Sequence, residues 1–506
     1  MSRVVSLPHL VVAVNGAPLD EAGVHALGSV RVQQRLSCPS QCELVFVDPP
    51  GASDIVSVFS PGNRLRLAAS GQPGPLFVGE VTAVEHVYGA ANERELRVRA
   101  YDHLHRLRKR QPVRAHVQLT PQDLARELVV DLDLTVEASE PGPLWQRLFQ
   151  HDQSDLALLV DVTEQCGLYC ILREDVLHLS TLAGMGDPVP LVLGESLHEA
   201  SLEVNGDPAC RSVTATGWNA LRVETHQSTA SSAREGRTAA AHVSPDRLGG
   251  NGERSLTGRG VETARHAEAL AQAELDRRIA NEVTFQGVAE GDTRLQPGTP
   301  VDISGVADRL AGRYVLTAAT HIIDHRRGYV TELSTVPPPP RPRPVGTVAT
   351  LGLVTQVNDP ENLGRVRVRL SAYEDLDTEW MQVLSAGAGG GKGLTMLPNV
   401  DDQVLVLFSL GDPGQGVVLG GLYGMQGSPD SGVESGSVRR YSLQTSGGLR
   451  VQLDDAHDTM RLENQQGSYV EFSPRRFHLH AASDLTMEAP GRSVTIRGQK
   501  IDFQRG

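Results

Sequence analysis

The stretch that decides the fold runs from Gly346 to Gly424 and reads GTVATLGLVTQVNDPENLGRVRVRLSAYEDLDTEWMQVLSAGAGGGKGLTMLPNVDDQVLVLFSLGDPGQGVVLGGLYG. It contains five short runs that alternate or are wholly apolar: Gly352–Val357, Gly364–Leu370, Trp380–Leu384, Gln403–Phe408 and Gly416–Leu422. Residues typical of turns separate them, such as Asn358-Asp359-Pro360 and Gly411-Asp412-Pro413. Short β-rich runs with such spacers predict a small closed β unit, and five strands in one short stretch favour an OB-fold barrel over 346–424.

The composition of the whole chain excludes several classes of function. The 506 residues carry a net charge of −14, which disfavours a phosphate-binding surface, so no nucleic-acid partner is expected. No apolar run is long enough to span a membrane as a helix. The N-terminus, MSRVVSLPHLVVAVNGAPLD, lacks the long apolar core of a signal peptide, so we expect a product made in the cytoplasm.

Five cysteines are present, and an odd number in a cytoplasmic product argues against a disulfide framework. Two C-x3-C pairs, Cys38/Cys42 and Cys166/Cys170, leave a four-thiolate zinc site as an alternative. Zinc knuckles usually have tighter spacing, so we interpret these residues as buried thiols.

The first two-thirds of the chain predict a mainly β base region with a few helices. We expect a β-barrel over 1–115, a helical segment over 116–180, a second β-barrel region over 181–336 and a proline-rich linker over 337–345. Thr120 and Ser154 are placed to cap two helices. A longer, alanine-rich helix is predicted over Glu262–Asn281, after a loop from Gln227 to Gly258 that we expect to be weakly ordered.

The tail, 439–506, follows a Gly/Ser-rich linker over 425–438 and shows apolar residues in two-residue steps. This alternation puts one set of side chains on one face of each short strand, which is typical of a β-helix or β-prism. Burial of this set falls well short of the entropy lost on ordering the tail, so three chains are expected to share one apolar axis. The predicted core of the needle is Val451, Leu453, Met460, Leu462, Val470, Phe472, Phe477, Leu479, Leu485, Met487, Val494, Ile496, Ile501 and Phe503.

The stretch from Gly346 to Gly424 also resembles a known family. The residues that carry the likeness, in order, are Asp359-Pro360, Leu363–Val368, Trp380, Leu397-Pro398, Val404–Phe408, Gly411-Asp412-Pro413 and Val418-Leu419-Gly420. They resemble the OB domain of the spike proteins of contractile injection systems, which include the VgrG proteins of type VI secretion, phage-baseplate spikes and the spikes of extracellular contractile particles. Phe77–Val81 and Tyr101–Leu107 resemble the first barrel of that family more loosely.

The resemblance implies a homotrimeric central spike with two tube-like β-barrels per chain, an OB-fold collar and an intertwined trimeric β-helix or β-prism needle. Its implied partners are two other copies of the chain, an inner tube protein, baseplate subunits, a tip-sharpening PAAR-like protein at the C-terminal end and, on firing, the target cell envelope. It would be assembled in the bacterial cytoplasm as part of a phage tail-like particle, in some systems released from the cell.

We expect no catalytic residues and no cofactor, so the protein is not interpreted as an enzyme. The turn Gly387–Gly393 lacks the first glycine and the Ser or Thr of a phosphate-binding loop. His478 and His480 are candidate metal ligands at a three-fold axis, but Phe477 and Leu479 continue the apolar series, which predicts that both histidines face outward.

Two alternatives stay open. The first is a spike with cell-wall hydrolase activity, which would need an acid–nucleophile pair within Gln227–Gly258. The second is an OB-fold module that binds nucleic acid or sugar, which would need exposed aromatic side chains on the barrel. The aromatic residues available for it are Tyr373, Trp380, Phe408 and Tyr423.

Overall fold

The computed structural model describes residues 9–48, 58–90, 93–219, 224–257, 261, 263–341, 346–408, 414 and 416–504. The chain forms two compact units, Met1–Gly420 and Gly421–Gly506. Several positions singled out in the sequence lie outside the described residues: the first eight residues, Gly258, Glu262, positions 342–345 of the proline-rich linker and the turn at 411–413. Among the described residues, no helix is long and apolar enough to cross a bilayer.

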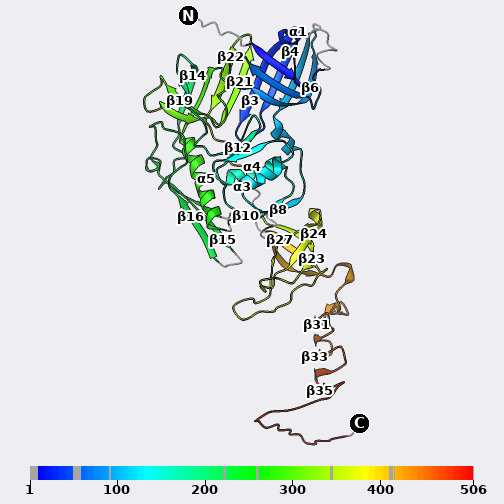
Figure 1. Cartoon of the computed structure of the whole chain (residues 1–506). Helices are drawn as coiled ribbons and strands as arrows, with labels where there is room; N and C mark the ends of the chain where they lie inside the picture. Colours follow the sequence, from blue (N-terminus) through cyan, green and yellow to red (C-terminus); the bar gives the residue numbers. More distant parts are fainter. Residues whose placement is uncertain are drawn as a thin grey trace. The chain divides into compact units, whose positions relative to one another are not determined.

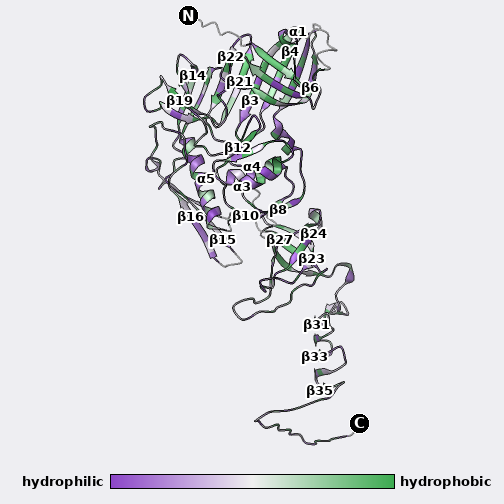
Figure 2. Ribbon diagram, in the orientation of Figure 1, coloured by the Kyte–Doolittle hydropathy of each residue, from purple (hydrophilic) through white to green (hydrophobic). Residues whose placement is uncertain are grey.

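The first barrel begins the chain (Figure 1). Its elements are β1 (Leu10–Val14), β2 (Ala17–Pro18), α1 (Glu21–Ala26), β3 (Leu27–Arg35), β4 (Gln41–Val47), β5 (Arg64–Ala69), β6 (Phe77–Tyr88) and β7 (Arg94–Tyr101). Alternate residues of these strands, such as Val30 and Val32 of β3, are buried in one core with Leu44, Phe46 and Leu67. Figure 2 shows the corresponding mixture of hydrophobic and hydrophilic residues along the strands.

A mixed segment follows the first barrel. Its elements are η1 (His103–Arg108), β8 (Arg114–Leu119), α3 (Pro121–Val129), β9 (Thr135–Ala138), β10 (Trp145–Gln150), α4 (Asp155–Gln165), β11 (Tyr169–Arg173) and β12 (Val176–Ser180). Both predicted caps are confirmed: the Thr120 hydroxyl accepts from the Asp123 amide in a capping box, and the Ser154 hydroxyl accepts from the Ala157 amide. These caps satisfy amides at the helix starts that have no partner within the helix.

The second barrel region is longer. Its elements are β13 (Val189–Val192), β14 (Leu197–Val204), β15 (Ser212–Asn219), β16 (Glu224–Ala230), η2 (Pro245–Leu248), β17 (Glu253–Leu256), α5 (Ala264–Glu282), β18 (Val283–Glu290), β19 (Pro300–Ser304), β20 (Gly312–Val315), β21 (Ala318–Asp324) and β22 (Gly328–Ser334). The predicted long helix is confirmed as α5, with Thr263 as its N-cap and Ala267, Ala271 and Leu275 on its buried side.

The prediction of a weakly ordered loop over Gln227–Gly258 is wrong in part. Most of β16 lies in it and pairs antiparallel with β15, while β17 pairs parallel with the other edge of β15. The irregular residues between them are tied to α5, where Arg234 Nε donates to Asp276 Oδ2 at 2.8 Å. The small polar residues that suggest a loop are tolerated because these strands are half-exposed.

One eleven-stranded sheet links the two barrels in the order β14-β18-β22-β21-β3-β4-β7-β6-β5-β1-β2. The link is the antiparallel pairing of β21 with β3, from Ala318 opposite Arg35 to Asp324 opposite Ser29. Because these strands are almost 300 residues apart, no local pattern in the sequence indicates that they pair.

The OB barrel follows. Its elements are β23 (Val348–Gln356), β24 (Arg367–Leu370), η3 (Ser371–Tyr373), β25 (Leu376–Asp377), β26 (Gln382–Val383), β27 (Gln403–Phe408) and β28 (Gly416–Leu422), in the sheet order β25-β24-β23-β27-β28-β26. The last two predicted strands are confirmed residue for residue. Val354, Val368, Val404, Val406 and Phe408 form its core.

A buried ion pair holds the turn between β23 and β24. Asp359 accepts Arg365 Nη2 at 2.7 Å and Nε at 2.9 Å, and it also accepts the backbone amides of Glu361 and Leu363. The Arg365 guanidinium therefore holds the pKa of Asp359 well below its usual range. The Asp-Pro motif that marks this turn in the sequence thus also supplies its anchor.

The C-terminal unit is a meander of short strands. Its elements are η6 (Gly424–Gln426), β29 (Val433–Glu434), β30 (Ser437–Val438), β31 (Arg440–Gln444), β32 (Arg450–Asp454), β33 (Thr459–Glu463), β34 (Tyr469–Ser473) and β35 (Arg476–His480). Strands β31 to β35 pair antiparallel with their neighbours in sequence order. No described residue beyond His480 lies in a strand.

A buried carboxylate joins the first barrel to the segment after it. Glu80 of β6 accepts Arg106 Nη2 at 2.6 Å and Nε at 3.0 Å, and it also pairs with buried His105. The Arg106 hydrogen bonds, aided by His105, outweigh burial and lower the pKa of Glu80 from 4.5 to about 2. A carboxyl with a depressed pKa stabilises the folded state above its ordinary pKa, and this stabilisation is lost as the pH falls from about 4.5 towards 2.

We therefore expect Glu80→Gln to lower the free energy of unfolding at pH 7 by about 2 kcal/mol, after allowance for solvent screening of the half-exposed Arg106. The difference from the wild type should shrink between pH 4.5 and pH 2. Thermal unfolding followed by circular dichroism at several pH values measures it. Glu85→Gln, at an exposed position on the same strand, is the control; equal losses in the two variants would contradict the assignment.

Candidate functional site: the apolar face of the C-terminal sheet

Two apolar rows run across the five strands β31 to β35. The strand registers place side chains of the same kind directly opposite one another at every step. The first row is Tyr441, Leu453, Met460, Phe472 and Phe477, and the second is Leu443, Val451, Leu462, Val470 and Leu479. Successive residues of a strand point to opposite faces, so both rows lie on one face of the sheet.

This face is open in the single chain. Its exposed members range from 36 % for Val451 to 62 % for Phe477, and Val470 is half-buried. Eight of the fourteen predicted needle-core residues lie on it. A contiguous face of ten apolar side chains is typical of an interaction surface rather than of a solvated one.

The face is hollowed beside its second row. A cavity of about 440 Å³ is lined chiefly by Leu443, Val451, Leu462, Leu479 and Leu485. Such an apolar hollow admits side chains of a partner.

The other six predicted core residues lie beyond the sheet. Leu485, Met487, Val494, Ile496, Ile501 and Phe503 are 48–86 % exposed and belong to no strand. A strand requires a neighbour that accepts and donates its backbone hydrogen bonds, and this segment has none within the described chain. The burial of these side chains in a trimer therefore stays a prediction.

The opposite face of the sheet is polar and internally paired. Arg461 donates to Glu463 at 2.7 Å and to Glu471 at 3.1 Å. Asp430 accepts from Arg440 Nη2 and from Arg450 Nη2, both at 3.0 Å, and the first of these guanidinium groups lowers its pKa. One face is thus suited to water and the other is not.

His478 and His480 lie on the polar face, as the alternation predicts. The Tyr469 hydroxyl lies 3.2 Å from His478 Nδ1, and the rings of Tyr469 and His480 are stacked with centroids 5.0 Å apart. On the other strand neighbour, the Arg461 guanidinium lies 4.0 Å from the centre of the Tyr469 ring. Both histidines are therefore members of an aromatic cluster within one chain.

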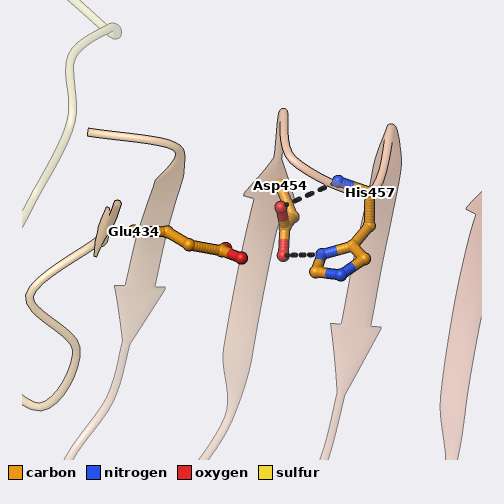
Figure 3. Close-up of side chains that lie close together, drawn as sticks. All are labelled: Glu434, Asp454 and His457. Atoms are coloured by element: carbon orange, nitrogen blue, oxygen red, sulfur yellow. Dashed lines mark hydrogen bonds and ion pairs between the residues drawn. The ribbon is translucent and has the colours of Figure 1, made fainter. Parts of the chain in front are cut away.

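The sequence analysis missed a group of possible metal ligands that the fold brings together. Glu434, Asp454 and His457 have ligand atoms within 4.8 Å of one another (Figure 3). Mixed carboxylate and imidazole donors suit zinc and similar divalent ions. Each already has a partner: His457 Nδ1 lies 3.2 Å from Asp454 Oδ2, and Arg440 Nη1 donates to Glu434 at 3.5 Å. Only Asp454 and His457 are close in sequence. Their spacing could therefore indicate these two ligands but not Glu434.

Three of the five basic side chains over 106–114 form ion pairs inside the chain. Arg106 pairs with Glu80, while Arg110 and Arg114 both lie within 3.3 Å of buried Asp155. Carboxylates of the same chain therefore engage these three guanidinium groups.

Two models of known protein families match this chain. A family model described as the Alg8 N-terminal domain matches residues 5–325, more than half of the chain. The chain belongs to the Alg8 N-terminal domain family. A second family model, described as the type VI secretion system/phage-baseplate injector OB domain, matches residues 350–423 of this family member and confirms the OB barrel.

One curated protein is similar to part of this chain. The type VI secretion system spike protein VgrG4b of Pseudomonas aeruginosa is 30 % identical to this chain over 162 residues. The match covers 28 % of this chain and 19 % of VgrG4b. The chain thus aligns with less than a fifth of this curated relative.

Two solved structures share the fold at low identity. The E. coli c3393 protein, described as a component of the type VI secretion system that resembles the T4 tail proteins gp27 and gp5, has 14 % identity and a TM-score of 0.53 over 81 % of this chain and 99 % of its own. The Francisella PdpA-VgrG complex in its lidded form has 9 % identity and a TM-score of 0.58 over 95 % and 81 %. The resemblance to VgrG-like and phage-baseplate spike proteins is confirmed.

The aromatic cluster on the polar face generates a prediction. Tyr469→Ala removes the contacts with Arg461 and His480 and should weaken the sheet by about 1–2 kcal/mol. Backbone amides of β34 and β35 should then exchange with solvent roughly tenfold faster, as native-state hydrogen exchange measures. Tyr469→Phe keeps the ring and loses only the hydroxyl, so its effect should be much smaller. Equal effects of the two variants would show that stacking is unimportant here.

Proposed function

We propose that three copies of this chain form the central spike of a contractile injection system, and that their C-terminal units wind into one needle. The observation that carries the proposal is the apolar face of β31 to β35, two complete rows of side chains that their own chain leaves open. Burial of such side chains at a shared axis contributes about 25 cal/mol per Å² of apolar surface. The polar faces would then point outward, as the ion pairs of Arg461 require.

The base would join this three-fold needle to a six-fold inner tube. Two similar barrels per chain supply six tube-like units in a trimer, so the base of the spike can match a hexameric ring and plug it in the baseplate. The partners in this proposal are the tube protein, baseplate subunits, a PAAR-like tip protein at the C-terminal end and the target envelope. The particle would be assembled in the bacterial cytoplasm and would resemble a phage tail.

The role is mechanical and needs no catalytic group. A needle closed by hydrogen bonds between strands and by a shared apolar core transmits contraction force without a hinge. The hydrolase alternative would require an acid–nucleophile pair within Gln227–Gly258; in the described part of that segment, Glu235 pairs with Arg237 and Asp246 with Arg211. A muramidase assay distinguishes the two functions.

The alternative of an OB binding module has little support from the barrel. Tyr373 and Phe408 pack edge to face with ring centroids 6.0 Å apart, and Phe408 is buried. Trp380 is covered by the Arg367 guanidinium at 5.3 Å. Tyr423 is 63 % exposed, but one aromatic side chain does not form a stacking platform.

Light scattering on the purified full chain tests the trimer. We expect a mass of about 163 kDa, three times the 54.4 kDa chain. Leu479→Asp places a charge on the apolar face and should reduce the trimer at micromolar concentration at least tenfold, because three buried carboxylates would meet near one axis. His480→Asp changes the neighbouring residue on the polar face and should leave the mass unchanged. A monomeric wild-type chain would overturn the proposed function.

A further inference from the structure

The C-terminal unit brings two carboxylates and an imidazole together beside its sheet. Glu434 ends β29, Asp454 ends β32, and His457 lies in the turn that leads from β32 to β33. Their ligand atoms lie within 4.8 Å of one another (Figure 3). All three residues belong to the unit Gly421–Gly506, so the group forms within one chain.

The distance between two of these ligand atoms fits a tetrahedral metal ion. His457 Nδ1 lies 3.2 Å from Asp454 Oδ2. Bonds of about 2.0–2.1 Å from zinc to nitrogen and oxygen, at the tetrahedral angle, place two ligand atoms about 3.3–3.4 Å apart. The imidazole and the carboxylate therefore need little movement to hold one ion between them.

Backbone hydrogen bonds orient the Asp454 carboxylate. Its Oδ1 accepts from the amides of Ala456 at 2.9 Å and of His457 at 3.2 Å, which leaves Oδ2 facing the His457 ring. Burial raises the pKa of Asp454, but the hydrogen bonds from His457 and from the two amides outweigh burial and lower this pKa below its ordinary value. The carboxylate is thus held in the ionised form that a metal ion binds.

Glu434 completes the group from a separate hairpin, and Figure 3 shows its carboxylate pointing toward Asp454. Its contact with Arg440 Nη1 is long, 3.5 Å. Arg440 lies closer to Asp430, because its Nη2 donates to Oδ1 at 3.0 Å and its Nε donates to Oδ2 at 3.2 Å. The guanidinium group can therefore keep its main partner when Glu434 turns toward a metal ion.

The remaining gap is within reach of side-chain rotation. The Glu434 side chain is 42 % exposed, so its torsions can change without displacing the core, and the gap between ligand atoms is at most 4.8 Å. The His457 side chain is 66 % exposed, which gives an ion access from solvent.

The donor set selects the class of metal. Calcium and magnesium prefer shells of oxygen ligands, whereas an imidazole with carboxylates suits zinc and similar divalent transition metals. Three ligands from the protein leave the fourth position of a tetrahedral ion for water. Zinc with one bound water is therefore the ion that this group fits.

We propose that Glu434, Asp454 and His457 bind one zinc ion per chain, which fastens the hairpin of β29 and β30 to the turn between β32 and β33. Asp454 follows Leu453 of the apolar face and so points to the polar side of the sheet. The ion therefore leaves the apolar face open, and the site does not depend on the trimer proposed above.

The hairpin belongs to the segment between the OB barrel and the meander. Asp430 already ties this segment to the polar face through Arg440 and Arg450, each at 3.0 Å. A zinc ion adds a second tie, at the end of β32. The segment would then be held to the sheet both by ion pairs and by metal–ligand bonds.

Zinc titration of the full chain tests the site. The protein is stripped with a chelator, and zinc chloride is then added at neutral pH in a calorimeter. We expect one zinc ion per chain at micromolar concentration. His457→Ala, Asp454→Asn and Glu434→Gln should each weaken binding at least about tenfold, since loss of a residue that only supports a metal ligand already weakens binding about 10–100-fold. Circular dichroism checks that each variant is folded.

The matched control is Asp455→Asn. Asp455 is exposed, follows Asp454 directly and lies outside the group, so this change removes the same charge and should leave zinc affinity unchanged. The proposal is overturned if the wild-type chain binds no zinc at micromolar concentration, or if the three ligand variants bind zinc as tightly as this control.

Native-state hydrogen exchange tests the fastening. Zinc should slow the exchange of backbone amides over 433–438 about tenfold in the wild-type chain but not in Glu434→Gln. Unchanged exchange in the wild-type chain would show that the ion does not fasten the hairpin. Light scattering tests the trimeric spike separately, so failure of the zinc site and failure of the spike are distinguishable.

Discussion

The antiparallel pairing of β21 with β3 is the interaction on which the base of this protein depends. It merges two barrels into a single eleven-stranded sheet, and it buries Ile323 and Val32 at the junction. A strand edge presents unpaired amides and carbonyls, and in the described part of the chain β14, at one end of this sheet, pairs with β18 alone. The pairing therefore fixes the two barrels against each other within one chain.

In the C-terminal unit, apolar side chains of the sheet are left uncovered within the described chain. Its sheet has a polar face held by ion pairs of Arg461 and Asp430 and an apolar face that nothing in the described chain covers. The charged side chains are confined to one face of the sheet. Burial of that face would be costly, because it would remove Arg461 and Glu471 from water. The asymmetry thus leaves one face of the sheet suited to water and the other apolar and open.

The OB barrel between these two parts has a complete core of its own. Val354, Val406 and Phe408 are fully buried, and the Asp359–Arg365 pair closes the turn after the first strand. It is also the part of the chain that the injector OB domain model matches, over residues 350–423.

The sequence by itself determined the local elements. Alternation and turn residues located β27 and β28, capping residues located the starts of α3 and α4, and two-residue apolar steps located the strands from Val451 to Leu479, because each of these signals depends on neighbours in the chain. Only the tertiary structure decided which strands meet. The β21–β3 junction, the pairing of β15 with β16 and β17 in an expected loop, and the Glu434–Asp454–His457 group all depend on contacts between strands that no local period encodes.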